Sequence, residues 1–238
     1  MAATMRTDIG KKRKQNEDSA WFGENLYVVA DGMGGHLAGE VASGIAVDTI
    51  KTLAGQTPAL TTLGSAVARA HKDIKDHAMT HESCSGMGTT LSVLWRAEGR
   101  MYIAHVGDSR IYRLRDGRLE QITQDHSLVD ELVRAGIITK EEARTHPRRN
   151  IITRALGTQG ENDPDLFQVE MREDDKWLLC TDGLSGMVRD EEIEDTLNHY
   201  DMEEAADRLL NLALDAGGSD NITLILCTGG EGAAWTRD

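Results

Sequence analysis

The chain has 238 residues, of which 39% are hydrophobic and 4% aromatic, and a formal net charge of −14 at pH 7. This aliphatic content suffices for a substantial core, which excludes disordered and fibrous proteins. The acidic balance argues against a protein that binds nucleic acid or an anionic membrane through a broad basic surface. Because no linker or shift in composition divides residues 1–238, we expect a single domain, and we expect it to be a monomer.

The N-terminal segment carries no signal-peptide pattern. Residues 7–14 are polar and no apolar stretch is long enough to span a bilayer, so we expect a cytoplasmic protein that does not insert into membranes. The cysteines, Cys84, Cys180 and Cys227, are odd in number and lack the pair spacing of a zinc site. We interpret them as buried, reduced thiols.

The first strong strand pattern is the apolar run 26–30, rich in β-branched residues, which ends at Asp31. Glycines at positions 32, 34 and 35 follow, where they allow the backbone to approach an ion or a phosphate closely. Their spacing does not match a Rossmann fingerprint, and the Lys-Ser/Thr pair of a P-loop is missing. Two interpretations stay open: Asp31 begins an ordinary tight turn, or it presents a carboxylate to a metal.

Helices and antiparallel hairpins follow this strand. Apolar residues at helical spacing predict two helices that pack on a sheet. Two hairpins come next, the second around the turn Asp116-Gly117. The predicted ranges are 39–50 and about 62–79 for the helices, and 88–96 with 101–106 and 111–114 with 119–122 for the hairpins.

Residues 136–156 form an irregular insertion after a predicted helix over 128–135. The insertion contains a capping-box pattern that starts at Thr139. Few of its residues are apolar, so we expect a mobile flap rather than part of the core. His126 and His146 lack a second ligand at metal-site spacing, and we interpret both as hydrogen-bonding loop residues.

The last third of the chain repeats the pattern of an apolar strand beside an aspartate. A strand that begins at Trp177 ends at Asp182, and Asp220 precedes a strand that reaches Cys227. The other predicted elements are helices over about 190–198 and 202–215, and a flexible tail over 229–238.

Four aspartates flank predicted strands: Asp31, Asp108 and Asp182 follow theirs, and Asp220 precedes its own. If the last strand is antiparallel to the others, all four carboxylates reach one edge. Clustered carboxylates repel each other unless a cation neutralises them, and oxygen donors such as these and the Gly32 carbonyl favour Mg²⁺ or Mn²⁺ over Zn²⁺. The alternative is four unrelated turn residues.

A pair of such ions predicts hydrolysis of a phosphate ester. Two ions about 4 Å apart can share a bridging water and lower its pKa, which provides a nucleophile without serine, cysteine or histidine. Arg13 is the candidate for binding two phosphate oxygens and stabilising the charge that develops on them. Taken alone, residues 13–19 also fit a solvated loop of mixed charge.

Short motifs occur in a specific order over nearly the whole chain, from about Thr7 to Cys227. They are Arg13-x-x-Asn16-Glu17-Asp18, Asp31-Gly32-Met33-Gly34-Gly35-His36 with Gly39-Glu40, Gly107-Asp108-Ser109-Arg110, Asp125-His126-Ser127, His146-Pro147-x-Arg149-Asn150, Thr153-Arg154-Ala155-Leu156-Gly157, Thr181-Asp182-Gly183 and Asp220-Asn221-Ile222-Thr223. In this combination the chain resembles the metal-dependent PP2C-type (PPM) serine/threonine phosphatases, and most closely their bacterial stand-alone catalytic domains. The resemblance implies an α+β fold, a four-layer α/β/β/α sandwich of two antiparallel sheets flanked by helix pairs.

The resemblance also implies two Mn²⁺ or Mg²⁺ ions in one active site. Asp31 resembles the ligand that bridges both ions, and Gly32 resembles the residue that supplies its carbonyl oxygen. Asp182 and Asp220 resemble the groups that complete the first metal. Asp108 together with Asp182 resembles a weaker third metal site.

Further residues resemble groups that surround the metals. Arg13 matches the arginine that binds the substrate phosphate. Glu17 and Asp18 resemble outer residues that hold metal-bound waters, and we place Asn221 in the same outer shell.

The proton donor to the leaving oxygen and the substrate contacts are less directly matched. Animal members have a histidine directly after the Asp-Gly pair, where this chain has Met33, and His36 occurs three places later. His36 is the candidate general acid; a metal-bound water, with His36 in a loop hydrogen bond, is the alternative. The flap matches a variable segment of the family, which makes Arg148 and Arg149 candidates for contacts with a phosphopeptide.

The resulting hypothesis is hydrolysis of phosphoserine and phosphothreonine in proteins, which reverses a bacterial kinase of the eukaryotic-like type. One alternative is a catalytically silent relative that binds phosphoproteins as a scaffold, but Asp31, Asp182 and Asp220 are all present. The other is a phosphatase of the same fold that acts on an anti-sigma-factor antagonist in partner switching. Such proteins usually carry sensor domains, and this chain has no spare length for one.

Overall fold

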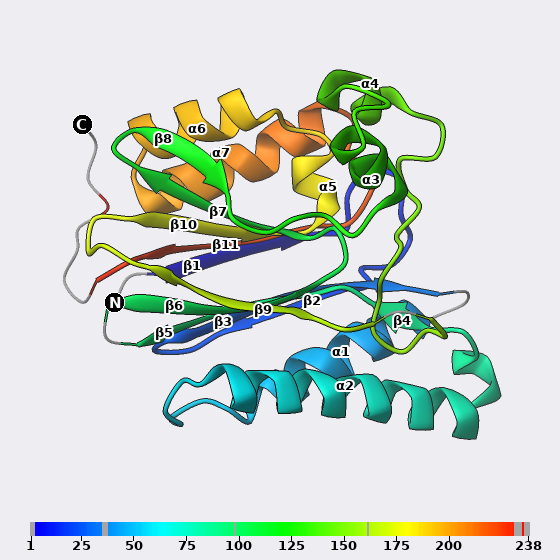
Figure 1. Cartoon of the computed structure of the whole chain (residues 1–238). Coiled ribbons are helices and arrows are strands. Elements are labelled where there is room, and N and C mark those ends of the chain that lie inside the picture. The colour runs from blue at the N-terminus through cyan, green and yellow to red at the C-terminus, as the bar shows by residue number, and fades with distance from the viewer. Residues whose placement is uncertain (1–2, 35–37, 98, 161, 231–234, 236–238) are drawn as a thin grey trace.

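Two antiparallel β-sheets lie face to face in the computed structural model, and helices cover the outer face of each sheet (Figure 1). The structure describes residues 3–34, 38–97, 99–160, 162–230 and 235. This is the predicted α/β/β/α arrangement, so the expected α+β fold class is confirmed.

Both sheets pair neighbouring strands antiparallel. The first has the order β1-β11-β10-β7-β8, and the second has the order β2-β3-β5-β6-β9, with the short β4 paired to the end of β3. The strands of the first sheet are β1 (Ala3–Asp8), β7 (Arg110–Arg115), β8 (Arg118–Gln121), β10 (Lys176–Cys180) and β11 (Ile222–Thr228). Those of the second are β2 (Asp18–Phe22), β3 (Leu26–Met33), β4 (Gly88–Thr89), β5 (Leu91–Ala97), β6 (Arg100–Val106) and β9 (Asp165–Glu170).

Successive residues of the central strands face different parts of the core. Val28 of β3 packs beneath the helices of the second sheet, whereas Val29 packs between the two sheets. In the first sheet, Leu224 of β11 lies beneath the helices and Ile225 lies between the sheets. Because both faces of these strands are covered, their sequences are continuous apolar runs rather than alternating ones.

The helices form two outer layers and one projecting group (Figure 1). Helices α1 (Ala38–Lys51) and α2 (Leu60–Thr80) cover the second sheet, and α6 (Asp190–His199) and α7 (Met202–Asp215) cover the first. The short helices are η1 (Glu82–Cys84), α3 (Leu128–Arg134), α4 (Lys140–Thr145) and α5 (Asp182–Ser185). Helices α3 and α4 lie together at one end of the molecule, with α5 nearby. Within the described ranges, no helix combines the length and the hydrophobicity needed to span a membrane.

Several local predictions need correction. Leu156, the last residue of the expected flap, is fully buried in the core beneath α1 and α2. The strand that was expected to end at Asp182 ends at Cys180. Strand β3 does not end at Asp31 but continues to Met33, because Gly32 and Met33 pair with Thr89 and Gly88 of β4. Strands β1, β2 and β9 were not predicted. The predicted helices are present within one to two residues of their expected ends, and the three cysteines are buried and free, as expected.

Part of the predicted tail is packed against the body of the protein. The Gly229 N–H donates to the Asp175 carbonyl oxygen at 2.8 Å. The Trp235 side chain is 8% exposed and its Nε1–H donates to the Tyr200 carbonyl oxygen at 3.1 Å. This corrects the expectation of an unstructured tail at these residues; 231–234 and 236–238 lie outside the described residues.

Candidate metal centre

The four predicted aspartates come from both sheets and meet at one end of the sandwich. Asp31 lies in β3, Asp108 follows β6, Asp182 begins α5 directly after β10, and Asp220 precedes β11. Strands β10 and β11 are antiparallel, as predicted. Strands β3 and β6 are each antiparallel to β5, so they run in the same direction. Within each sheet, the topology therefore brings two of the four positions to the same edge.

The electrostatics show that these carboxylates are close enough to repel one another. The pKa of Asp31 is raised well above its ordinary value by burial, and then by Asp18, Asp182, Asp108 and Asp220. Burial followed by Asp182 likewise raises the pKa of Asp108. With no cation, each added negative charge in this cluster costs free energy.

Several carboxylate oxygens in the cluster have no hydrogen-bond donor. Among the described residues, Asp18 Oδ1, Asp108 Oδ1 and Asp182 Oδ1 are buried and unpartnered. Within the described ranges, no group of three or more Asp, Glu, His or Cys side chains stands in an arrangement that could hold a metal ion. Buried polar atoms are normally paired, and anionic oxygens without donors are the ligands that hard divalent cations prefer. The donor set therefore fits Mg²⁺ or Mn²⁺.

The backbone around Asp31 is fixed by the threonines of the β4–β5 segment. The Asp31 N–H donates to Thr90 Oγ1 at 2.8 Å, and the Asp31 carbonyl oxygen accepts from the Thr90 N–H at 2.9 Å. Thr89 Oγ1 donates to the same carbonyl at 3.0 Å. These contacts hold Asp31 on a rigid strand, which the sequence alone did not indicate.

Gly32 lies where no side chain fits. A Cβ at this position would stand 2.1 Å from the Gly39 carbonyl oxygen and 2.5 Å from the Glu17 carbonyl oxygen. The Gly32 N–H donates to that Glu17 carbonyl at 3.1 Å. The glycine thus permits close approach of β3, the start of α1 and the N-terminal loop.

Asn221 anchors the N-terminal loop beside the cluster. Its Oδ1 accepts from the Glu17 N–H at 2.8 Å, and its Nδ2 donates to the carbonyl oxygens of Ile9 and Gln15 at 3.0 and 2.8 Å. The Asn221 side chain is 3% exposed. Satisfying these backbone groups is a structural reason for an amide at this position.

Asp18 lies directly opposite Asp31 in the β2–β3 ladder. Its Oδ2 accepts from Thr181 Oγ1 at 2.9 Å. Burial, which outweighs that donor, raises the pKa of Asp18 to about 7. In the sequence, Thr181 is only one residue of the Thr181-Asp182-Gly183 motif, and no local pattern predicts its role as a donor across the two sheets.

Arg13 lies at the rim of the cluster. Its Nη2 donates to Asp220 Oδ2 at 2.7 Å, and its Nη1 lies 3.9 Å from Glu17 Oε2. The Arg13 side chain is 47% exposed. The guanidinium therefore borders both the carboxylates and solvent.

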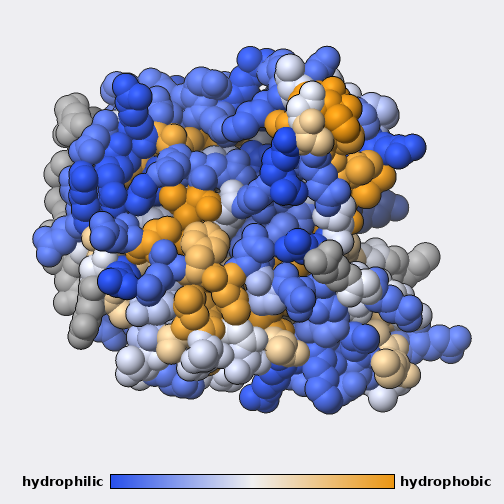
Figure 2. All heavy atoms as spheres, in the orientation of Figure 1, coloured by the Kyte–Doolittle hydropathy of each residue, from blue (hydrophilic) through white to orange (hydrophobic). Residues whose placement is uncertain are grey.

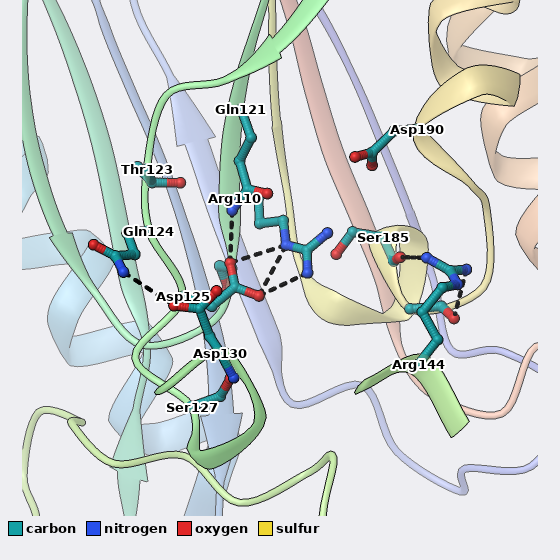
Figure 3. A network of polar contacts seen from close by, with 12 residues as sticks. Arg110, Gln121, Thr123, Gln124, Asp125, Ser127, Asp130, Arg144, Ser185 and Asp190 are labelled. Carbon is teal, nitrogen blue, oxygen red and sulfur yellow. Dashed lines mark hydrogen bonds and ion pairs between the residues drawn. The ribbon is translucent and has the colours of Figure 1, made fainter. Parts of the chain in front are cut away.

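Arg110 is a second cation near the cluster, and it is paired with the carboxylate of Asp125 (Figure 3). Its Nε and Nη2 donate to the carboxylate of Asp125 at 2.7–3.0 Å, and its Nη1 donates to Tyr112 Oη at 2.9 Å. Gln121 Nε2 also donates to Asp125 Oδ1, at 2.8 Å. Because Arg110 is held by Asp125, it does not neutralise the oxygens of Asp108 by direct contact.

A cavity of about 360 Å³ opens between the flap and the α5–α6 turn, and Asp108, Asp182 and Asp220 are among its lining residues. Arg144 of α4 lies across it, with its Nη1 and Nη2 both 3.4 Å from the carbonyl oxygens of Ser185 and Gly186 (Figure 3). These contacts connect the flap to the short helix that begins with Asp182. Apart from the basic character of the flap, no sequence pattern indicated this link.

The two flap arginines differ in position. Arg149 lines the cavity, whereas Arg148 is exposed and does not belong to the described lining. Apolar side chains also gather on the surface over α3 and α4 (Figure 2), where Ile137 is 67% exposed. His36 lies outside the described residues.

Known proteins are similar to this chain in sequence and in fold. The family model "Protein phosphatase 2C" matches residues 12–227. The serine/threonine phosphatase stp of Listeria welshimeri is 44% identical over 239 residues, which cover 95% of this chain and 95% of the relative. The serine/threonine protein phosphatase PstP of Mycobacterium tuberculosis is 45% identical over 224 residues, which cover 93% of this chain and 43% of PstP.

Solved structures of bacterial phosphatases are also similar to this chain. The crystal structure of the Mycobacterium tuberculosis phosphatase PstP superposes with a TM-score of 0.92 at 43% identity and covers 97% of this chain and 99% of that one. The catalytic domain of PstP in complex with two manganese ions has a TM-score of 0.88 at 42% identity and covers 94% of this chain and 96% of that one. The chain therefore belongs to the protein phosphatase 2C family and is a serine/threonine protein phosphatase.

Proposed function

We propose that the carboxylate cluster holds two Mn²⁺ or Mg²⁺ ions, whose chemistry when bound is to activate a water for attack on a phosphate ester. The observation that carries this proposal is the set of buried, unpartnered oxygens on Asp18, Asp108 and Asp182. A relative that contains two manganese ions supports the number and the kind of ion.

The ligand set follows the predicted roles. Asp31, the Gly32 carbonyl oxygen, Asp182 and Asp220 would hold the pair of ions, with Asp31 serving both and Asp182 and Asp220 completing the first site. Asp108 and Asp182 would hold a weaker third ion. The positions of these residues at one edge of the two sheets support this assignment.

Outer residues keep these ligands in place. Asn221 and Glu17 hold the N-terminal loop against β11, and Asp18 joins β2 to Thr181 beside Asp182. Such outer contacts orient metal ligands and adjust their affinity. We assign Glu17, Asp18 and Asn221 to this supporting role.

Arg13 binds the substrate phosphate. Its present partner, Asp220, is an anion at the rim of the cluster, so the guanidinium is already oriented toward the place where a phosphate would lie. An arginine can donate two parallel hydrogen bonds to a phosphate and stabilise charge that grows during displacement. His36 remains the predicted proton donor to the leaving serine or threonine oxygen.

Phosphoserine and phosphothreonine proteins are the substrates, and a eukaryotic-like serine/threonine kinase is the partner whose action the enzyme reverses. The name and the sequence similarity of the stp and PstP phosphatases support the substrate class. Retention of the aspartates argues against a silent scaffold.

The first experiment is phosphate release from a phosphothreonine peptide by the purified chain, with Mn²⁺, with Mg²⁺ or with EDTA, and with a phosphotyrosine peptide for comparison. We expect turnover of the phosphothreonine peptide that requires the ion and stops in EDTA. A folded protein that shows no turnover with either ion would refute the proposal and favour a binding role.

A further inference from the structure

His126 lies at the junction of three segments: the Gly107 loop, the base of the flap and the start of β9. This junction is next to the proposed metal ligand Asp108. The His126 side chain is 6% exposed. The ring Nδ1 of His126 accepts from the Gly107 N–H at 3.1 Å, and the backbone N–H of His126 donates to the Gly107 carbonyl oxygen at 2.7 Å. Two hydrogen bonds therefore fix the residue that precedes Asp108.

The backbone of Gly107 is also confined by close contact with Thr90. Its φ is +106°, and a Cβ there would stand 2.5 Å from Thr90 Cγ2. Thr90 Oγ1 also lies 2.8 Å from Ser109 Oγ and accepts from the Asp31 N–H. The loop that carries Asp108 is thus held between Thr90, which also fixes Asp31, and the ring of His126.

The far side of the His126 ring contacts a carboxylate. Its Nε2 lies 3.1 Å from Asp165 Oδ2, at the start of β9. Because Nδ1 accepts from a backbone N–H, the neutral ring carries its proton on Nε2 and donates it to Asp165. Arg154 Nη1 donates to the other Asp165 oxygen at 3.2 Å. Asp165 therefore sets both the tautomer and the orientation of the ring.

The base of the flap joins the same junction. The His126 carbonyl oxygen accepts from the Thr153 N–H at 2.8 Å, and Ser127 and Ile152 form an antiparallel bridge. His105 packs against the ring with centroids 4.9 Å apart. The imidazole is held from several directions, while the unpartnered Asp108 Oδ1 lies just beyond the residue it fixes.

We propose that His126 is a positioning residue for Asp108: through Gly107 it places the Asp108 carboxylate for the weakest of the bound ions, and Asp165 keeps its Nδ1 available as the acceptor. This inference rests on the proposed function, because it assumes a divalent-ion site that includes Asp108. Histidines oriented by a carboxylate are a recurring means of fixing metal ligands. Here the ring acts on the ligand's backbone instead of on the ion.

Two substitutions separate the two sides of the ring. In His126→Asn, the side-chain oxygen can still accept from the Gly107 N–H, but the contact with Asp165 is lost. In His126→Gln, the longer amide can still donate to Asp165, but the Gly107 N–H loses its acceptor. His71→Gln is the matched control, because His71 Nδ1 also accepts a backbone N–H, from Gly157 at 3.1 Å, far along the chain from Asp108.

The measurement is a titration with Mn²⁺ in which electron paramagnetic resonance detects the free ion. Asp108→Asn is the reference for loss of the weakest ion. We expect His126→Gln to weaken that ion about tenfold or more, and His126→Asn to stay within about threefold of wild type. Turnover of a phosphopeptide should follow the same order. His71→Gln should match wild type.

The outcomes distinguish this inference from the proposed function. A wild-type protein that binds no Mn²⁺ would overturn the proposed function, and the inference with it. If wild type binds Mn²⁺ but His126→Gln binds the weakest ion as tightly as wild type does, the inference alone is wrong. Equal losses in the Asn and Gln variants would also overturn it, because they would indicate general loosening of the junction; thermal unfolding of each variant checks that both are folded.

Discussion

At the scale of single residues, the buried aspartates determine the charge of the candidate metal centre. Asp31, Asp108 and Asp182 all have a raised pKa, caused first by burial and then by neighbouring carboxylates. A carboxyl whose pKa is raised on folding stabilises the fold only while it is protonated, and this stabilisation is lost as the pH rises through the folded-state pKa. At neutral pH the metal-free cluster therefore opposes folding, and the same carboxylates favour a cation.

We predict that Asp182→Asn loses activity but gains stability in the metal-free protein. The amide removes one negative charge from the cluster, which relieves repulsion, by about 1 kcal/mol or more. Without this ligand, phosphate release should fall by roughly a hundredfold or more. The test is denaturant unfolding in EDTA at pH 7 beside a turnover assay; a variant less stable than wild type in EDTA would contradict the repulsion argument.

Arg13→Ala should mainly weaken the use of substrate phosphate. Hydrogen bonds to a charged group contribute about 1.5–3 kcal/mol, so we expect KM for a phosphothreonine peptide to rise by about tenfold or more. Arg13→Lys keeps the charge but not the forked donors, and its KM should lie between those of wild type and Arg13→Ala. Steady-state kinetics measures this, and an unchanged KM in Arg13→Ala would exclude a phosphate contact.

At the scale of elements, the β5–β6 pair and the flap are stabilised in different ways. Residues of β5 and β6 hold a buried polar pair, in which His105 Nδ1 lies 2.9 Å from Ser92 Oγ and His105 Nε2 donates to the Gln124 carbonyl oxygen at 3.0 Å. The flap helix α4 begins with a full capping box, in which Thr139 Oγ1 accepts from the Glu142 N–H and the Glu142 side chain accepts from the Thr139 N–H. The β5–β6 pair is therefore stabilised by hydrogen bonds in the core, whereas α4 is stabilised at the surface by its own capping box.

The buried His105 makes stability depend on acid. Burial, followed by the neighbouring His126, lowers the pKa of His105 to about 3. The unfolded chain binds a proton near pH 6.5 and the folded one does not, so stability is full above about pH 6.5 and is lost as the pH falls toward 3. Between pH 6.5 and 5 this amounts to about 1.5 kcal/mol. Urea unfolding of wild type and His105→Asn should show a steeper acid loss in wild type; parallel profiles would contradict this assignment.

The flap arginines should differ in effect because only one of them lines the cavity. We expect Arg149→Ala to raise KM for a phosphopeptide by about two- to fivefold, the size of a partly screened ion pair. Arg148→Ala is the matched control, since Arg148 is exposed beside it and should change KM little. With p-nitrophenyl phosphate, which has no peptide, neither variant should differ from wild type. Equal effects of the two variants on the peptide would show that the cavity does not select between them.

At the scale of the whole molecule, the sequence predicted the centre better than the edges of the sheets. The three strands it missed, β1, β2 and β9, are all edge strands. Edge strands are covered on fewer sides, so they lack the continuous apolar run that identifies a central strand. β8 is also at an edge, but the Asp116-Gly117 turn identified its hairpin.

The contacts that the sequence could not supply all join distant segments. Thr90 to Asp31, Thr181 to Asp18 and Arg144 to Ser185 each depend on pairing between elements and not on local pattern. The aspartates were predictable because each lies beside an apolar strand, whereas their supports lie in segments with ordinary composition. The same reason explains why β3 was expected to end at Asp31, because its last pairing partner, β4, is remote in sequence.

The centre joins the two sheets, so ion binding should stabilise the whole molecule. Asp31 lies in a strand of the second sheet and Asp108 follows another, whereas Asp182 follows and Asp220 precedes strands of the first sheet. An ion that binds only the folded chain adds about 2.7 kcal/mol at one hundred times its Kd. For a chain of this size we expect Mn²⁺ to raise Tm by about 5 °C or more relative to EDTA. Asp182→Asn should start from a higher Tm in EDTA and gain less from Mn²⁺, as measured by scanning calorimetry. If Mn²⁺ raised both Tm values equally, the ions would bind somewhere other than between the sheets.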